Sequence, residues 1–160
     1  MTLISVRPGI LQRDKAMEII PMKSEHIKAA ARLEEECFTI PRSENALSEE
    51  LSNPLTSFFV CVDNGAVVGY IGSYNVADEV SVTDVAVTEA CRGRGAGNAL
   101  VCALIDKAQS DGARLVTLEV RLSNEAAIAL YLKNGFEKIG VRHGFYSQPK
   151  EDALIMTRYL

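Results

Sequence analysis

The chain has 160 residues, 48% hydrophobic and 24% charged, which is typical of one globular domain. Its net charge of −4 argues against nucleic-acid binding, which usually needs a basic face. The longest apolar run, Ala99–Ile105, is too short to cross a bilayer, and the N-terminus lacks the features of a secretory signal. We therefore expect a cytoplasmic protein that acts without a nucleic acid or a membrane as partner.

In chain order, residues 1–16 show no clear periodicity and are expected to form an N-terminal extension before a single domain over residues 17–160. The first half of that domain predicts one strand, two helices and three strands. These elements are a strand at 17–22, a helix capped by Ser24, a helix opened by Ser43 and stopped at Asn53–Pro54, and strands at 57–62, 66–76 and 80–87. Asp63–Asn64–Gly65 predicts a tight turn between the first two of those three strands.

The second half alternates helices with strands. The expected elements are a helix at 95–110 ended by Gly112, a strand at 115–120, a helix at 124–134, and strands at 136–141 and 152–159. Gly135 followed by Phe136 is typical of a Schellman ending, in which a left-handed glycine and a hydrophobic contact close the helix. A block of strands followed by alternation predicts an α+β fold with a mixed sheet and helices on both faces.

The four cysteines predict buried thiols. None forms a CxxC pair and only two histidines accompany them, so we expect no bound metal. Three of them, Cys37, Cys61 and Cys102, lie in apolar patterns. Cys91 lies beside a glycine-rich segment, where both a packed thiol and an accessible, reactive one are open. The two histidines, His26 and His143, are expected at the surface.

The glycine-rich segment is the strongest chemical signal. Arg92-Gly93-Arg94-Gly95-Ala96-Gly97 follows a strand and opens a helix. Glycines let the backbone approach a ligand, and the N–H groups at a helix start bind phosphate, so a pyrophosphate site is the natural interpretation. A plain glycine turn is the alternative. The Lys-Ser or Lys-Thr of a Walker A loop is missing, and both registers of a dinucleotide fingerprint fail.

The remaining pattern, R-x-x-G-x-G, resembles the signature of the GNAT acetyltransferases. The resemblance runs from Met17 to Tyr159 through VAVTEACRGRGAGNAL, LEVRLSNEAAIALYLKNGFEKIG and EDALIM. The run L-E-V-R-x-S-N-x-x-A-x-x-L-Y-x-x-x-G-F is particularly similar to the RimI group, which acetylates N-terminal amines of proteins. The resemblance implies the GNAT fold, with a mostly antiparallel central sheet, and acetyl-CoA as co-substrate.

The resemblance also implies where acetyl-CoA binds. The backbone of the loop would hold the pyrophosphate through Arg92, Gly93, Arg94, Gly95, Ala96, Gly97 and Asn98. The strand carrying Val85, Ala86 and Val87 would pair with pantetheine and offer a backbone N–H to the thioester carbonyl. Asn124 matches the family position that bonds the cofactor arm. Since it also stands at a helix start, simple capping is an equal alternative.

Glu119 and Tyr131 are the expected catalytic pair. A carboxylate within a β-rich run is costly unless it is solvated, paired or useful, so Glu119 is either a general base or half of a structural pair with Arg121. The RimI resemblance favours the base, acting through water. Tyr131 is protonated at neutral pH and can give a proton to a thiolate, although helical tyrosines more often pack into the core. The resemblance makes Tyr131 the general acid, with Tyr146 in reserve.

The acceptor site departs from the RimI pattern at two places. Arg42 stands where the group has Trp, and Phe145–Tyr146 replaces its Tyr-Tyr pair. Arg42 and Tyr146 are therefore the expected substrate-binding residues. The resemblance implies a protein N-terminus, such as that of a small-subunit ribosomal protein, as the acceptor. A small amine, a lysine, or a non-catalytic acyl-CoA-binding role are the alternatives, and the oligomeric state is open.

Overall fold

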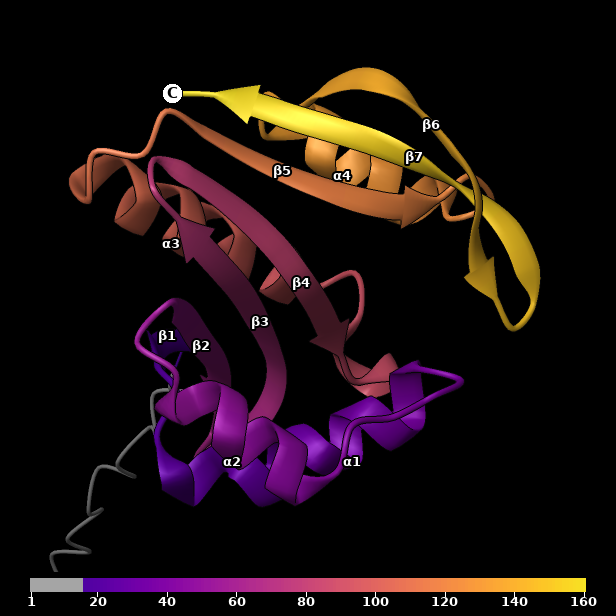
Figure 1. The fold of residues 1–160 in the computed structure, drawn as a ribbon. Helices are drawn as coiled ribbons and strands as arrows, with labels where there is room; N and C mark the ends of the chain where they lie inside the picture. Colours follow the sequence, from indigo (N-terminus) through magenta and orange to yellow (C-terminus); the bar gives the residue numbers. More distant parts are fainter. Residues whose placement is uncertain (1–15) are drawn as a thin grey trace, which may run out of the picture.

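The computed structural model describes residues 16–160, in which one seven-stranded sheet carries helices on both faces (Figure 1). The expected extension at residues 1–16 therefore lies, except for its last residue, outside the described residues. The strands are β1 (Glu18–Pro21), β2 (Thr56–Asp63), β3 (Ala66–Val76), β4 (Glu79–Val87), β5 (Leu115–Arg121), β6 (Glu137–Ser147) and β7 (Lys150–Tyr159). The α-helices are α1 (Ile27–Cys37), α2 (Glu44–Ser52), α3 (Ala96–Ser110) and α4 (Glu125–Lys133).

The strand order is β1-β2-β3-β4-β5-β7-β6, and β4 with β5 is the parallel pair in an otherwise antiparallel sheet. This arrangement confirms the predicted order of elements and the predicted α+β fold. The largest difference concerns β6, which continues to Ser147 because its far end pairs with β7, from Tyr146 opposite Glu151 to Ser147 opposite Lys150. The first helix also differs, since a 3₁₀ turn at Ser24–His26 precedes α1.

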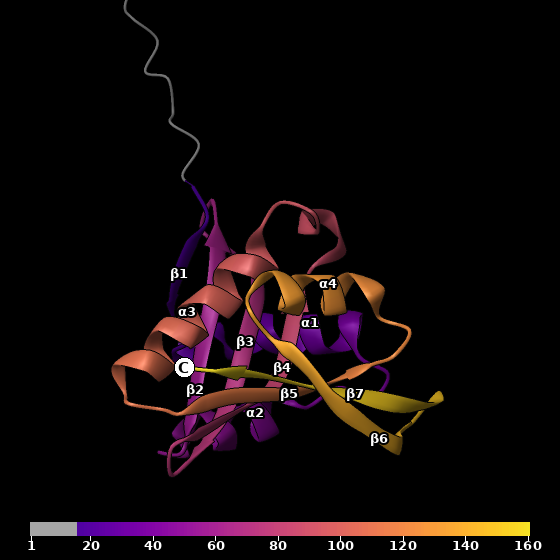
Figure 2. The same ribbon diagram turned by 90° about the horizontal axis from the view of Figure 1, so that it is seen from above.

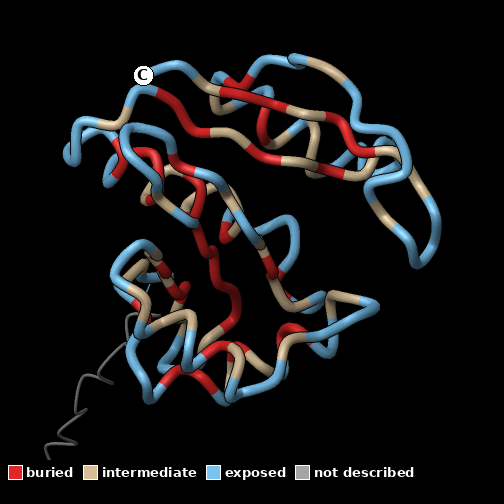
Figure 3. The backbone as a smooth tube through the Cα atoms, in the orientation of Figure 1, coloured by how far each residue is buried: buried red, intermediate tan, exposed pale blue. Residues whose placement is uncertain are grey.

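Two hydrophobic cores lie on opposite faces of the sheet (Figure 2). Helices α3 and α4 cover one face, and residues such as Leu100, Val116 and Tyr131 fill the core beneath them. Helices α1 and α2 cover the other face above β2, β3 and β4, where Leu33, Leu47 and Tyr70 are buried. Figure 3 shows the consequence: buried backbone follows the middle of the sheet, whereas β6 is exposed along most of its length.

Glycines in the left-handed region close the elements at the predicted places. The β2–β3 turn places Asn64 and Gly65 at φ values of 49° and 80°, and Gly112 ends α3 at 78°. After α4, Gly135 adopts a φ of 82°, and the Phe136 N–H donates to the Tyr131 carbonyl at 3.1 Å. This is the predicted Schellman ending, and it fixes the last turn of α4 against the core.

Strands β4 and β5 separate after a short contact, as Figure 1 shows. Their pairing covers only Glu79–Ser81 with Leu115–Thr117, and both strands then continue apart. A register shift between Gly72 and Ser73 of β3 marks a bulge in β4, which bends the strand away. Among residues 16–160, no helix has the length and apolar content needed to cross a membrane.

Candidate active site

The gap between β4 and β5 exposes the edge of a central strand. Beyond Ser81, β4 pairs with β3 on one side, through Val85 opposite Ile71 and Val87 opposite Gly69, and no strand within residues 16–160 pairs with its other side. An unpaired edge presents free backbone N–H and C=O groups, which an extended ligand can use as a further strand would. The predicted cofactor residues Val85, Ala86 and Val87 all lie on this edge.

The glycine-rich loop leads from that edge into the start of α3. Gly93 and Gly95 adopt φ values of 78° and 89°, and a Cβ added at either would meet no atom within 4 Å. Gly95 is the N-cap of α3 and supplies no side-chain cap, so the first N–H groups of the helix, from Ala96 to Asn98, face the open loop. The backbone therefore has the shape and the donors that a pyrophosphate needs.

Both arginines of the loop make contacts that fix its shape. The Arg92 Nε donates to the carbonyl of Val87 at 3.1 Å, which ties the loop back to β4. Arg94 forms an ion pair with Asp63 at 3.1 Å. Cys91 is buried below the loop. Of the two alternatives for this thiol, packed or accessible, the structure therefore shows the packed one. The arginine side chains thus hold the shape of the loop, while the backbone N–H groups at the start of α3 are left without an intrahelical partner.

Glu119 lies on the face of the sheet that α1 and α2 cover. Val116, Leu118 and Val120 of β5 pack under α3 and α4, so the alternating residue Glu119 points to the opposite face. Its carboxylate lies 3.5 Å from the Arg142 guanidinium. Arg121 pairs instead with Glu151, at 3.3 Å, so the alternative of a Glu119–Arg121 pair is not the arrangement found.

Tyr131 approaches the gap from the other face. Its ring is buried against Phe136, with 5.5 Å between ring centroids, so the ring packs in the core as the alternative interpretation expects. Its hydroxyl has no hydrogen-bond partner among residues 16–160, where every fully buried polar side-chain atom has one, so the hydroxyl reaches accessible space. Burial, with smaller contributions from Tyr146 and Asp84, raises the pKa of Tyr131 to about 12 and keeps it protonated.

Tyr146 reaches the gap from the β6–β7 hairpin. Its ring lies under the guanidinium of Arg121, 4.1 Å from the ring centroid, and meets Phe145 edge-on. Partial burial raises the pKa of Tyr146, Arg121 lowers it, and the charges of Glu119 and Asp84 raise it further. These charges belong to β5 and β4, the two strands that border the gap.

Asn124 is the N-cap of α4. Its side-chain oxygen accepts from the Ala127 N–H at 3.1 Å, so the capping alternative is observed. No residue in 16–160 uses its amide nitrogen, which leaves that donor available to a ligand. His26 differs from its expectation: it is buried, and its Nδ1 accepts from the Lys23 N–H, because the 3₁₀ turn folds the ring inward. His143 is exposed, as expected.

Arg42 is turned inward, into a cluster of charges on the α1–α2 face. Its guanidinium contacts three carboxylates and one hydroxyl from four different elements. These partners are Glu34 of α1, Glu50 of α2, Tyr70 of β3 and Asp84 of β4. Glu34 is 1% exposed and also accepts from the Arg42 backbone N–H at 3.0 Å, which ties the α1–α2 connection to the sheet.

Asp84 is a charged residue beside the gap that the sequence did not single out. It lies on β4 directly before Val85, with one carboxylate oxygen on Arg42. Burial, supported by the charges of Glu34 and Glu50 and opposed by Arg42, raises the pKa of Asp84 to about 7. The signal in the sequence is a single acidic residue inside the apolar run VTDVAV. Nothing in that run shows which charges lie around it.

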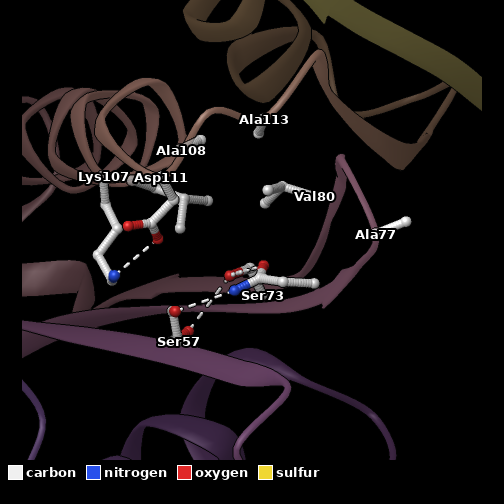
Figure 4. Close-up of a pocket in the computed structure, with 10 residues that line it drawn as sticks. Ser57, Ser73, Ala77, Val80, Lys107, Ala108, Asp111 and Ala113 are labelled. Atoms are coloured by element: carbon white, nitrogen blue, oxygen red, sulfur yellow. Dashed lines mark hydrogen bonds and ion pairs between the residues drawn. The ribbon is translucent and has the colours of Figure 1, made fainter.

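A small cavity of about 50 Å³ lies at the far end of α3, away from the glycine loop (Figure 4). Ser57, Ser73 and Asn75 line its polar side and hydrogen-bond to one another at 3.0 to 3.1 Å. The ion pair Lys107–Asp111 closes its rim. Its polar groups are mutually satisfied and it has room for about one or two waters, so it does not compete with the gap as an active site.

Comparison with known proteins identifies the family of the chain. Residues 27–136 match the model of the acetyltransferase (GNAT) family. The chain is 31% identical over 141 residues to the ribosomal protein bS18-alanine N-acetyltransferase of Escherichia coli, covering 87% of this chain and 95% of that protein. It is 35% identical over 117 residues to the N-alpha-acetyltransferase RimI of Mycobacterium tuberculosis, covering 71% and 72%.

A solved structure has the same fold. The crystal structure of the Escherichia coli ribosomal-protein-S18-alanine N-acetyltransferase matches with a TM-score of 0.82 and 30% identity, covering 89% of this chain and 93% of that one. The resemblance to RimI enzymes is therefore confirmed, as are the predicted fold and the use of acetyl-CoA. The chain belongs to the acetyltransferase (GNAT) family and is an acetyl-CoA-dependent N-acetyltransferase.

Proposed function

We propose that the enzyme acetylates the N-terminal α-amine of a protein, and specifically an alanine of a small-subunit ribosomal protein. The main structural support for this proposal is that Glu119 and Tyr131 lie on opposite faces of the sheet, on elements that flank the gap between β4 and β5. The names of the relatives in Escherichia coli and Mycobacterium tuberculosis add the acceptor class. The proposed acceptor also places the reaction in the cytoplasm, where ribosomal proteins are made.

Acetyl-CoA would bind on the α3 side of the gap. The N–H groups at the start of α3 and in the loop from Arg92 to Asn98 would hold the pyrophosphate, and the edge from Val85 to Val87 would pair with the pantetheine arm. The free amide nitrogen of Asn124 would donate to the same arm. When bound, acetyl-CoA supplies a thioester activated for acyl transfer, and a backbone N–H of β4 would stabilise the charge that develops on its carbonyl oxygen.

The two sides of the gap would then perform different proton transfers. Glu119, on the α1–α2 face, would accept a proton from the acceptor nitrogen, directly or through water. Tyr131, on the α3–α4 face, would donate its proton to the leaving thiolate. Its pKa of about 12 keeps that proton in place until the thiolate forms. This arrangement supports direct attack by the amine, because nucleophile and thioester would meet from opposite faces of the sheet.

An α-amine suits this site better than a lysine does. The pKa of an α-amine is about 7.7–8.0, so a useful fraction is neutral at pH 7, whereas that of lysine is about 10.4. An extended N-terminal segment can also use free main-chain groups for register. We propose that Tyr146, at the mouth of the gap, contacts this segment, and that Arg42 acts on the acceptor site through its contact with Asp84.

Initial rates with a panel of acceptors test the proposal. The panel contains peptides that begin with Ala, Ser or Met, the same peptides with a blocked N-terminus and one internal lysine, and a polyamine. We expect the largest kcat/KM for a free N-terminal Ala and no turnover of blocked peptides. Faster turnover of the polyamine or of the lysine would identify a GNAT enzyme for a different amine.

A further inference from the structure

The charge cluster around Arg42 contains more negative than positive charge. One guanidinium meets the three carboxylates of Glu34, Glu50 and Asp84. Glu34 has the strongest support, since its carboxylate accepts from the Arg42 side chain, the Arg42 backbone and the Tyr70 hydroxyl. Asp84 contacts Arg42 through one oxygen only. Glu50 also uses one oxygen, but it lies on α2, so Asp84 is the member on the sheet itself that keeps an oxygen free to accept a proton.

The second oxygen of Asp84 faces accessible space. It has no hydrogen-bond partner among residues 16–160, and no fully buried polar side-chain atom in that range lacks one. Asp84 lies on the part of β4 past Ser81, which pairs with β3 alone within residues 16–160. Its side chain is 22% exposed, so the free oxygen is accessible beside the gap between β4 and β5. The charge of Asp84 also raises the pKa of Tyr131 and of Tyr146.

Asp84 and Glu119 lie on the same face of the sheet. Val80 of β4 and Val116 of β5 are paired and both pack under α3, which aligns the faces of the two strands. Past the bulge, Val85 and Val87 pack on the α3 side, and Ala86 packs on the α1–α2 side. Asp84 therefore shares the α1–α2 face with Glu119. One carboxylate stands on each side of the opening.

Amide formation from an ammonium group requires two proton acceptors. The nitrogen of R–NH₃⁺ keeps one hydrogen in the product amide and so must lose two protons. One of them ends on sulfur and the other in solvent. Glu119 accounts for one of these transfers in the proposed function, on which this inference rests.

We propose that Asp84 is a second catalytic carboxylate, which takes the first proton from the acceptor ammonium. Its carboxylate receives that proton, and the freed lone pair forms the C–N bond while the C–S bond breaks and its electron pair leaves with sulfur. Glu119 takes the second proton, and Tyr131 protonates the thiolate. Return of one proton to Tyr131 and release of the other to solvent restore all three groups. Arg42 is a positioning residue, because it fixes the Asp84 carboxylate at the gap.

The pKa of about 7 suits Asp84 to this step. It lies just below that of an α-ammonium, about 7.7–8.0, so the proton transfer is only slightly unfavourable. The charged and titratable groups that face Asp84 come from every element around it: Glu34, Arg42, Glu50, Tyr70, Tyr131 and Tyr146. Among them Glu50 raises the pKa of Asp84 from outside the gap, which makes Glu50 a useful control.

The test compares two acceptors in the intact enzyme. One is a peptide with an N-terminal alanine, and the other begins with trifluoroalanine, whose fluorines leave the amine neutral at pH 7. We expect Asp84→Asn to lower kcat by about 10²-fold on the alanine peptide, in the range of a positioned general base, and by less than about threefold on the fluorinated one. Glu119→Gln should remain slow on both. Equal losses on both peptides for Asp84→Asn, or no loss on either, would overturn the inference.

Glu50→Gln provides a matched control and a second readout. It removes a carboxylate from the same Arg42 cluster but not from the gap. The plateau rate should stay near that of the wild type, while the acidic limb of kcat/KM, near pH 7 in the wild type, moves to lower pH. A limb that does not move in Glu50→Gln would contradict the role of Asp84, even if Asp84→Asn failed to fold.

The identity of the acceptor amine and the role of Asp84 can be tested separately. If the wild type acetylates lysine or a small amine rather than α-amines, the proposed function fails. The comparison of Asp84→Asn is then made on that amine and on an analogue that is neutral at pH 7. The same expected and contradicting results decide the inference about Asp84.

Discussion

Ser81 on β4 and Thr117 on β5 form the last pair of the parallel ladder, and both strands continue past it to Val87 and Arg121. The ladder between these two strands thereby ends near the middle of the sheet. In the proposed function, acetyl-CoA approaches this point from the face with α3, and the acceptor from the face with α1 and α2.

Gly95→Ala should weaken CoA binding. The φ of 89° at the N-cap of α3 is unfavourable for any residue with a Cβ, so the loop and the first N–H groups of the helix must shift. Gly112→Ala is the matched control, since Gly112 has a φ of 78° and an equally open environment at the other end of α3. Both variants should lose about 1 kcal/mol of stability.

Calorimetry with CoA separates the two glycine variants. We expect at least a tenfold rise in Kd for Gly95→Ala and an unchanged Kd for Gly112→Ala. Equal affinities in the two variants would remove the loop from the cofactor site.

Glu119→Gln should lower kcat by about 10²–10⁴-fold, because the amide cannot accept the proton. Its shape is unchanged, so CoA affinity and thermal stability should be close to those of the wild type. Arg142→Gln is the control: it removes the ion-pair partner of Glu119, whose contact is largely exposed and contributes about 0–1 kcal/mol. If the arginine variant is as slow as the glutamate variant, then the ion pair matters and the proton transfer does not.

Tyr131→Phe should slow turnover by about 10²-fold while the ring keeps its contact with Phe136. Tyr159→Phe, at the exposed end of β7, should have no effect. Because the pKa of Tyr131 is about 12, this residue stays protonated in the wild type at moderately alkaline pH. We therefore expect no loss of kcat from ionisation of Tyr131 below about pH 11. A tyrosine-dependent loss that begins near pH 9 would indicate another acid.

The pH dependence of the protein's stability should reveal the raised pKa of Asp84. Its pKa is raised from the ordinary 3.8 to about 7 in the folded state, so folding favours the protonated form. That contribution is complete below about pH 4 and is lost as the pH rises to about 7. Asp84→Asn should therefore gain in Tm relative to the wild type across this range. A constant difference in Tm between the two from pH 4 to pH 8 would show that the pKa is not raised.

Much of the fold could be predicted from local signals. The limits of β3 agree with the predicted strand at 66–76, because turn residues flank it on both sides. Gly112 and Gly135 ended their helices as predicted, since a left-handed residue is a local requirement. The far half of β6 was missed because the hydrophobic alternation that identifies a strand is lost there, and pairing with β7 alone makes it one.

The candidate site also contains some features that local motifs predict and others that they do not. Contiguous motifs predicted the glycine loop and led to Glu119 and Tyr131. Two other features depend on contacts between distant elements. Arg121 pairs across the β6–β7 hairpin instead of with its neighbour Glu119, and Arg42 is turned toward Asp84, 42 residues further along the chain. Such pairings follow from the strand order, which periodicity does not specify.

The most direct measurement uses one peptide with two competing amines, a free N-terminal alanine and an internal lysine. The wild-type enzyme is incubated with this peptide and acetyl-CoA at pH 7, and tandem mass spectrometry locates the acetyl group. We expect the group on the α-amine, with the lysine unmodified and with the product absent in Glu119→Gln over the same time. Acetyl found on the lysine alone would contradict N-terminal acetylation as the function of this enzyme.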